Sequence, residues 1–317
     1  MISRRQLLKG FTAFGAGSAG LGGYAVAETW QLAVTRYPIT PVGWPARLSV
    51  RLAVLADLHV CEPWMGLARL EAIVARTNAL GADAVLLLGD YVAGSGMSRV
   101  SESVPHAAWA GVLGKLAAPL GVHAVLGNHD WWEDAEAQHN RCGPTMCGRA
   151  LERAGIAVYH NEAVRLSKHS EAFWLAGLGD QWALYPRHGA RRRSLRIPYE
   201  GLDDLDATLA AVTDSAPVVL MAHEPDIFSR VPERVALTVS GHTHGGQVQL
   251  MGFTPIIPSR YGRRYAYGHV VEGRSESGDV GTHRHLVVSG GLGCSGVPVR
   301  FGRPPEIVVV ELGPVDA

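Results

Sequence analysis

Five short apolar runs in this chain each stop at a histidine, aspartate or asparagine, and this recurrence constrains the fold more than any other feature. The runs and their ends read VRLAVLADLH, DAVLLLGD, GVHAVLGNHD, APVVLMAH and VALTVSGHTH. A β-branched apolar run of this length is typical of a buried strand. In open α/β sheets, ligands bind at the carboxyl ends of the strands. We therefore predict that these polar residues converge in space.

Segments with helical periodicity separate the early strands. We predict helices at Leu67–Leu80, Ala107–Leu116, Pro144–Ala154 and Leu202–Val212. Further strands are expected near Ala157, Val164 and Phe173, and at QVQL, HLVVSGG and EIVVVEL. Early alternation followed by a strand-rich finish favours two stacked sheets flanked by helices, an α/β sandwich in a single domain.

The composition supports a folded domain rather than a disordered or nucleic-acid-binding chain. The 317 residues are 47% hydrophobic and 18% charged, so a sizeable core can form. Lys and Arg number 29 and Asp and Glu number 29. This balance argues against nucleic acid as the main partner, because phosphate backbones bind basic surfaces.

The first residues have the features of an export signal. Arg4 and Arg5 precede Leu7-Leu8, and a Gly/Ala-rich run ends in Ala25-Val26-Ala27. This pattern predicts a twin-arginine signal over 1–27, handled by the twin-arginine export machinery and followed by an A-x-A cleavage pattern. An uncleaved N-terminal anchor is the alternative. We expect a lead-in over 28–48, a catalytic domain over 49–313, and a location in the periplasm or on the outer face of the cytoplasmic membrane.

The residue types at the strand ends are metal ligands. Imidazole and carboxylate together suit manganese, iron or zinc, and the set lacks the thiolates of structural zinc sites. Asp57 and His59 alternate about one leucine, which would put both donors on the same side of an extended segment, and His242 and His244 have the same spacing. Glycines around His242 and His244 would allow unusual backbone angles and close approach to a metal.

The motifs D-x-H, G-D, G-N-H-D, a lone H and G-H-x-H, in that order from Leu52 to His244, resemble the calcineurin-like metallophosphoesterase family. The resemblance implies a four-layer αββα sandwich with two divalent metal ions, Mn²⁺ first and Fe or Zn as alternatives. It also implies that Asp57, His59 and His244 hold one ion. Asn128, His223 and His242 would hold the other, and Asp90 would bridge the two.

The same resemblance implies the chemistry. A metal-bridging hydroxide would attack phosphorus in line, and His129 would act beside the leaving-group oxygen as general acid or transition-state stabiliser. Asp130 would either orient a neighbouring group or cap the following helix. The serine/threonine phosphatases of the wider family carry an aspartate three positions after G-D, where this chain has Ala93. A phosphoprotein substrate is therefore disfavoured, and the group that orients His129 is not identified by the sequence.

Substrate contacts are less sharply indicated. Trp131 and Trp132 could line an apolar groove or pack in the core, and we expect them to line the groove. Arg263 could contact the substrate. Cys142 and Cys147 could pair in an oxidising compartment.

The function predicted is hydrolysis of a phosphodiester or pyrophosphate in a cell-envelope, lipid-linked or nucleotide-linked substrate. The exported bacterial branch of the family, which includes UDP-diacylglucosamine pyrophosphatases, is the part that the chain resembles most. The alternatives are a phosphomonoesterase of the same fold and a metal-binding scaffold without catalysis.

Overall fold

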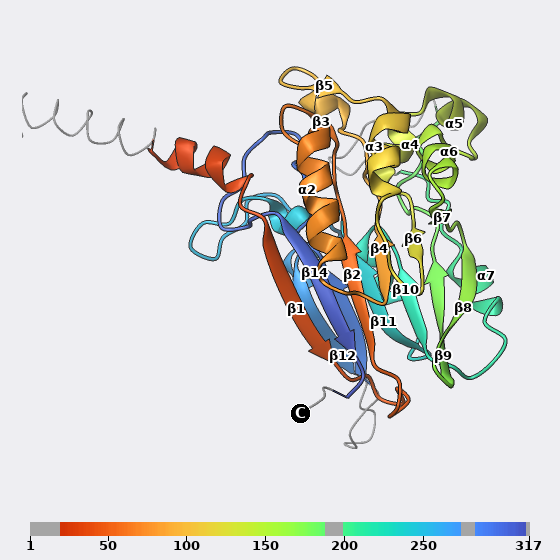
Figure 1. The fold of residues 1–317 in the computed structure, drawn as a ribbon. Helices are drawn as coiled ribbons and strands as arrows, with labels where there is room; N and C mark the ends of the chain where they lie inside the picture. Colours follow the sequence, from red (N-terminus) through yellow and green to blue (C-terminus); the bar gives the residue numbers. More distant parts are fainter. Residues whose placement is uncertain (1–19, 188–198, 274–282, 315–317) are drawn as a thin grey trace, which may run out of the picture.

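The computed structural model describes residues 20–187, 199–273 and 283–314 (Figure 1). Two six-stranded sheets stack face to face in this part of the chain. The first sheet has the strand order β1-β14-β2-β4-β6-β7. Its strands are β1 (Ala33–Ile39), β14 (Glu306–Leu312), β2 (Val50–Leu55), β4 (Ala84–Leu87), β6 (Val122–Ala124) and β7 (Ala157–Val158).

The second sheet has the order β12-β13-β11-β10-β9-β8. Its strands are β12 (Gly268–Gly273), β13 (His283–Val288), β11 (Val235–Ser240), β10 (Val218–Met221), β9 (Glu171–Gly177) and β8 (Glu162–Lys168). In the first sheet β2, β4 and β6 are parallel, and in the second β9, β10, β11 and β13 are parallel. Their carboxyl ends therefore lie at common edges of the two sheets.

Alternation along each strand builds three apolar layers. Leu52 and Val54 of β2 face the second sheet and pack with Val219 and Leu237 between the sheets. The intervening Ala53 belongs to a different cluster, on the outer face. Because successive side chains of a strand point to opposite faces, an unbroken apolar run can bury both.

Helices cover the outer faces. The first sheet is covered by α2 (Leu67–Asn78), α3 (His106–Leu113) and α6 (Met146–Arg153). On α2 the buried residues Leu70, Ile73, Val74 and Thr77 recur at helical spacing. The second sheet is covered more thinly by α7 (Leu205–Ala210) and the 3-10 turns η2 (Pro225–Ser229) and η4 (Gly262–Tyr265). The predicted four-layer αββα sandwich is confirmed.

The remaining short elements lie in the loops. They are α4 (Asn128–Trp132), α5 (Ala135–Asn140), η1 (Ser95–Met97), η3 (His244–Gly246), β3 (Cys61–Glu62) and β5 (Glu102–Ser103).

One expected strand is absent. QVQL forms no strand and contributes only isolated bridges, from Val248 to Phe301 and from Leu250 to Phe253. The stretch 28–48 contributes β1, which pairs with β14 in parallel. Cys142 and Cys147, whose pairing the sequence left open, are both free thiols, Cys142 exposed and Cys147 buried.

The N-terminal stretch falls partly outside the described residues. Arg4, Arg5 and the rest of 1–19 are not described, and a helix covers 20–28. This helix contacts the domain, since the Ala25 carbonyl accepts a hydrogen bond from the Arg300 amide and the Tyr24 and Phe301 rings meet edge to face. No helix in the described ranges is long and apolar enough to cross a membrane.

Candidate functional site

The predicted strand-end residues meet at one edge of the two sheets. Asp57 and Asp90 follow β2 and β4 of the first sheet, and Asn128 begins α4 directly after β6. His223 follows β10 and His242 follows β11 of the second sheet. Five separate breaks in the sequence are therefore brought together by sheet topology alone.

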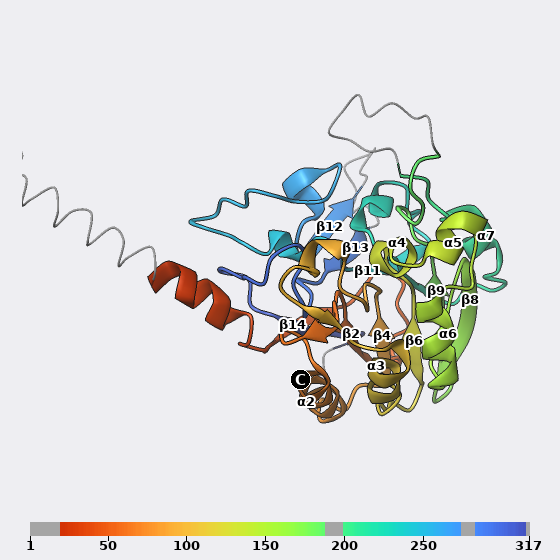
Figure 2. The ribbon, with the colours of Figure 1, turned by 90° about the horizontal axis from the view of Figure 1, so that it is seen from above.

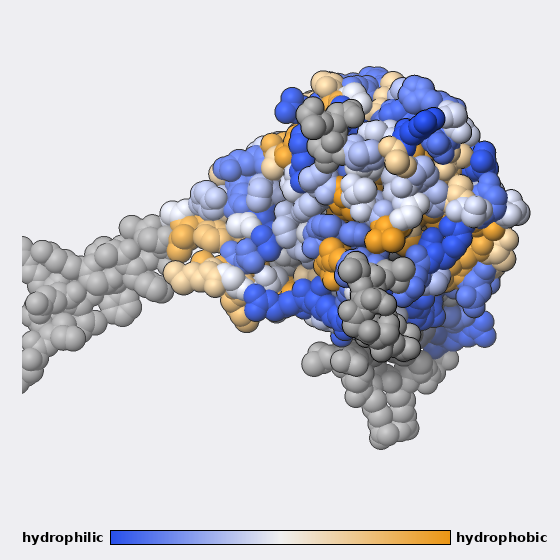
Figure 3. Space-filling view, turned by 90° about the horizontal axis from the view of Figure 1, so that it is seen from below, coloured by the Kyte–Doolittle hydropathy of each residue, from blue (hydrophilic) through white to orange (hydrophobic). Residues whose placement is uncertain are grey.

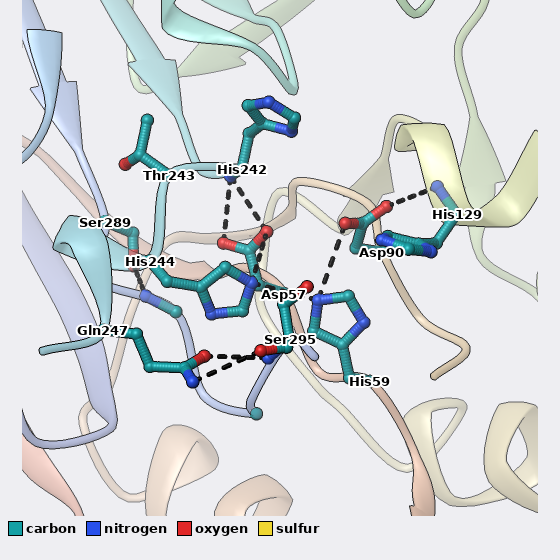
Figure 4. Close-up of polar contacts among 12 residues, drawn as sticks. Asp57, His59, Asp90, His129, His242, Thr243, His244, Gln247, Ser289 and Ser295 are labelled. Carbon is teal, nitrogen blue, oxygen red and sulfur yellow. Dashed lines mark hydrogen bonds and ion pairs between the residues drawn. The ribbon is translucent and has the colours of Figure 1, made fainter. Parts of the chain in front are cut away.

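The first cluster contains Asp57, His59 and His244. The two imidazole Nε2 atoms lie 3.0 Å apart, and His244 Nε2 lies 3.8 Å from a carboxylate oxygen of Asp57 (Figure 4). All three side chains are buried, and their ligand atoms lie within 4.8 Å of one another. This compact arrangement of nitrogen and oxygen donors fits one cation.

The second cluster contains His223, His242 and Asp90, with Asn128 beside them. Asn128 Oδ1 lies 2.9 Å from His242 Nδ1 and 3.2 Å from His223 Nε2. Asp90 Oδ2 lies 3.4 Å from His223 Nε2 and 3.6 Å from His59 Nε2. The Asp90 carboxylate thus stands between the two clusters, as a bridging ligand must.

Backbone carbonyls orient two of the imidazoles, and burial favours the neutral form of two of the histidines. His59 Nδ1 lies 3.0 Å from the Val92 carbonyl and His223 Nδ1 lies 2.6 Å from the Leu88 carbonyl, so each Nδ1–H donates there and leaves Nε2 free. Burial lowers the pKa of His59 to about 4 and that of His242 to about 3. Neutral imidazoles at these positions are ready ligands.

The buried carboxyl group of Asp57 requires a compensating positive charge when it is ionised. Complete burial raises the pKa of the Asp57 carboxyl to about 7, because an ionised carboxylate without a cation loses its solvation. Asp57 also accepts hydrogen bonds from the His242 amide at 2.9 and 3.1 Å, which joins the two sheets at the site. The donor set therefore fits two divalent cations, one at each cluster.

The backbone of the site is strained. Asp57, His59, Asp90, His242 and His244 all have positive φ, from 45° to 67°. Residues other than glycine avoid this region, because the left-handed conformation costs about 1–2 kcal/mol per residue. The expectation that Asp57 and His59 share one side of an extended segment is wrong, because left-handed turns aim these side chains. The same turns send His242 and His244 to different clusters.

Gly127 allows the loops to approach one another. A Cβ added there would lie 2.5 Å from an oxygen of Asp90 and 2.6 Å from the ring of His223. Glycine is required at this position because any side chain would occupy the space of the ligands.

Arg300 is a site residue that the sequence analysis did not identify. Its guanidinium is fully buried, donates to the carbonyls of Gly290 and Gly293, and lies 3.3 Å from His244 Nδ1. Burial, followed by the charges of His59 and Arg300, holds the pKa of His244 well below its usual value. Arg300 thus fixes the 290–303 loop against the first cluster.

His129 lies at the edge of the site, with its ring edge to face with that of His59. Glu133, one helical turn later, places Oε1 3.8 Å from His129 Nδ1 and also accepts from the Ser95 amide. Burial lowers the pKa of His129, but the charges of Asp90 and Glu133 outweigh burial and raise it. Glu133 therefore supplies the carboxylate that is missing at Ala93.

Gly94, the neighbour of Ala93, packs against the ring of His129. Gly94 lies so close to His129 that an added Cβ would sit 2.2 Å from the ring. The 93–95 backbone thus occupies one side of the imidazole, and the orienting carboxylate approaches from α4 instead.

Asp130 holds backbone rather than substrate. Its buried carboxylate accepts hydrogen bonds from the amides of Gly127, Asp90 and Tyr91, each at 2.9 Å. The bond from Gly127 caps α4, and the other two fix the loop that carries Asp90. Asp130 therefore orients neighbouring groups, and it does not cap a following helix, because it is the third residue of α4 and α5 is capped by Asp134. Its contacts are with backbone and do not support a direct catalytic role.

An apolar pocket of about 330 Å³ opens beside the two clusters. Trp132 and Trp182 form one wall, and Val248, Ile256 and Val297 are among the residues of the other. Trp132 stacks on Tyr199 with ring centroids 4.6 Å apart, and Trp182 meets the His242 ring edge to face at 4.7 Å. Aromatic rings thus continue directly from a candidate metal ligand into the pocket wall.

Two of the predicted substrate contacts do not line the pocket. Trp131 is only 1% exposed and packs in the core beneath the first sheet's helices, because α4 turns it away from the pocket that Trp132 faces. Arg263 does not line the pocket, since its exposed guanidinium donates to the Gly252 carbonyl.

Trp182 was missed although the sequence carried a signal. Leu178-Gly179-Asp180 after β9 repeats the strand-end pattern of Gly89-Asp90. Burial, then the charge of Glu224, holds the pKa of Asp180 well above its usual value. Asp180 accepts from the Trp182 amide and Glu224 from the Gln181 amide, so this buried carboxyl pair behind His223 fixes the loop that carries Trp182.

Comparisons with known proteins show the family of the chain. The chain is 30% identical to an uncharacterized metallophosphoesterase, YkuE, of Bacillus subtilis over 98% of each chain. It is 29% identical to the phosphodiesterase YaeI of Escherichia coli over 98% of this chain and all of that one. A crystal structure of a Danio rerio dimetal phosphatase aligns at TM-score 0.41 and 14% identity, covering 77% of this chain and 88% of that one. The family model for calcineurin-like phosphoesterases matches residues 50–246, and the chain belongs to that family.

Proposed function

We propose that this chain, a phosphoester hydrolase by its family, is a dinuclear metal-dependent phosphodiesterase whose substrate carries an apolar group. The substrate class is a phosphodiester or pyrophosphate of the cell envelope, either lipid-linked or nucleotide-linked. The relative YaeI, named a phosphodiesterase, supports diester chemistry.

The chain's own residues divide the reaction between them. Asp57, His59 and His244 would hold one divalent cation, and Asn128, His223 and His242 the other, with Asp90 shared. Such a pair supplies electrophilic activation of the phosphoryl group and of a water molecule.

His129 would give a proton to the departing oxygen. Its side chain lines the pocket, and the Glu133 carboxylate lies 3.8 Å from His129 Nδ1. Burial lowers the pKa of His129, but the charges of Asp90 and Glu133 raise it overall, which favours a proton on the ring at the moment of bond cleavage.

The apolar pocket is the single observation that carries the diester assignment. Among the described residues that line it, none is a lysine or arginine. A phosphomonoester dianion gains most from cationic side chains, whereas a diester has one charge fewer and a second substituent that needs a place. Trp132, Trp182 and Ile256 offer that substituent an apolar site.

Parallel kinetics on metal-loaded protein test the assignment. We expect kcat/KM to be at least tenfold higher for bis-p-nitrophenyl phosphate than for p-nitrophenyl phosphate, and to rise further for diesters with a long acyl chain. Preference for the monoester would contradict the proposal and support the phosphomonoesterase alternative.

We propose manganese as the metal, with iron or zinc as alternatives, because the donors are imidazole, carboxylate and amide oxygen. Elemental analysis of protein purified without chelators should find about two equivalents of transition metal per chain. Its absence from folded protein would count against a dinuclear site.

We also propose export by the twin-arginine route, which carries folded proteins and would preserve a loaded metal site. The support is Arg4-Arg5 with the apolar run behind it. Cell fractionation should place the protein in the periplasm or on the outer face of the cytoplasmic membrane. The double variant Arg4→Lys/Arg5→Lys should remain in the cytoplasm. Unchanged distribution of that variant would contradict this route.

A further inference from the structure

The loop between β11 and β12 exposes an apolar tip. Met251 is 100% exposed, and Leu250, Phe253 and Ile256 are 52%, 65% and 75% exposed. Isolated exposed apolar residues are common, but four within seven positions of one loop are not. The tip needs a partner that can cover it.

The backbone holds this tip in place. Leu250 and Phe253 exchange two backbone hydrogen bonds of 2.8 Å, and the residues between them, Met251 and Gly252, both have positive φ (48° and 80°). Such two-residue turns favour Asn-Gly, and a methionine there costs conformational energy. The turn therefore presents a large apolar side chain where a small polar one would be more stable.

The loop that carries the tip is basic, and one of its arginines, Arg264, pairs with Glu272 of β12. Residues 247–265 contain Arg260, Arg263 and Arg264 and no aspartate or glutamate. All three arginines are exposed. Apolar side chains flanked by arginines match the boundary between acyl chains and anionic headgroups.

The tip is continuous with the N-terminal helix. Phe301 bonds through its backbone to Gln247 and Gln249 at the base of the loop, and its ring packs on Tyr24 of the helix 20–28. Helix and loop project to the same side of the molecule (Figure 2), and hydrophobic residues continue along the helix where it leaves the domain (Figure 3). Leu21 and Tyr24 are exposed there.

The chain that precedes this helix points to the same partner. Nineteen residues lie before Gly20, outside the described part, and they contain Arg4, Arg5 and Lys9 but no acidic residue. A basic segment of this composition is attracted to anionic lipid headgroups.

The face also contains the mouth of the active-site pocket. Pro255, Ile256 and Pro258 line the pocket from within, and Met251 and Phe253 stand on the outer side of the same loop. We propose that the 250–256 tip inserts into the headgroup region of an anionic lipid bilayer and opens the pocket toward it. This inference rests on the proposed function, since it states where a lipid-linked diester would be met.

Insertion is measured without catalysis. Full-length, metal-loaded protein with Cys142→Ser and Met251→Cys is labelled with an environment-sensitive fluorophore and mixed with vesicles of phosphatidylethanolamine and phosphatidylglycerol. We expect a blue shift, and quenching by lipids that carry spin labels on their acyl chains. The control label replaces Val42, which is exposed in the β1–β2 connection at the opposite end of the sheet, and should show neither effect. A label at 251 that stays in water while the protein floats with vesicles would overturn the proposal, as would failure to bind them.

A second variant separates docking from chemistry. Met251→Asp/Phe253→Asp should lower turnover of a long-chain diester in vesicles at least tenfold and leave turnover of soluble bis-p-nitrophenyl phosphate unchanged. Equal turnover in vesicles would overturn the proposal. Insertion of the label without any diester hydrolysis would leave the docking face standing and contradict the proposed function instead.

Discussion

The metal-ligand cluster and the pocket mouth beside it are built in opposite ways. The ligands are buried, follow strands of two parallel arrays, and five of them have strained backbone that neighbouring hydrogen bonds hold in place. The mouth is made of exposed loop, where Ile256 and Val297 are 75% and 54% exposed. Chemistry that needs donors at fixed distances is placed where the sheets enforce them, and substrate choice is left to loops that can vary.

The largest effect should come from the ligand that both clusters share. Asp90→Ala removes the carboxylate between them, so metal content should fall below two equivalents and kcat should fall by on the order of 10³-fold. Elemental analysis and turnover of bis-p-nitrophenyl phosphate measure both. Asp206→Ala, which removes an exposed carboxylate in the first turn of α7, is the matched control. If the Asp90→Ala variant kept both its metal content and its kcat, the claim that the buried cluster, unlike the pocket mouth, needs every donor in a fixed place would be contradicted.

His129→Ala should separate proton transfer from metal binding. Since His129 contacts the leaving group rather than the cations, we expect kcat to fall about 10²-fold while metal content stays near that of the parent. A leaving group of low pKa, which needs no proton, should narrow the loss. An equal loss for good and poor leaving groups would exclude the general-acid role.

Glu133→Gln tests the carboxylate that replaces the missing aspartate. The charge of Glu133 raises the pKa of His129, so removing that charge lowers this pKa. As the pH is raised, activity that needs protonated His129 then begins to fall at a lower pH than in the parent protein. We expect kcat to fall roughly tenfold near neutral pH and the descending limb of the pH–rate profile to move to lower pH. The control is Glu136→Gln, on the exposed face of α5. An unshifted limb would mean that Glu133 acts only as packing.

Trp182→Ala should give the smallest effect and sharpen the comparison from the side of the mouth. Loss of the aromatic wall should raise KM roughly fivefold for diesters with an apolar group and leave kcat and metal content nearly unchanged. Trp64→Ala, whose indole donates to the Val100 carbonyl away from the pocket, is the control. A fall in kcat with unchanged KM would place Trp182 in support of His242 instead.

Most of the fold could be predicted because its strands are continuous apolar runs. Both faces of β2, β4, β10 and β11 are buried, so these strands can be recognised in the sequence without knowledge of the strands that pair with them. β1 was missed for the opposite reason. It is an edge strand with mostly half-exposed residues, and only its pairing with β14 makes it a strand. A strand was wrongly predicted at QVQL, because local alternation of apolar and polar residues does not show whether a partner strand lies beside it.

The sequence by itself determined which residue types follow each strand, and parallel topology then obliges those residues to share an edge. Tertiary structure alone decided how they point. Left-handed turns at Asp57 and His242, the approach of Glu133 from α4, and the choice of Trp132 over Trp131 as pocket wall depend on contacts between segments far apart in sequence. Such contacts leave no periodic trace in the sequence, because they are set by distance in space rather than by spacing along the chain.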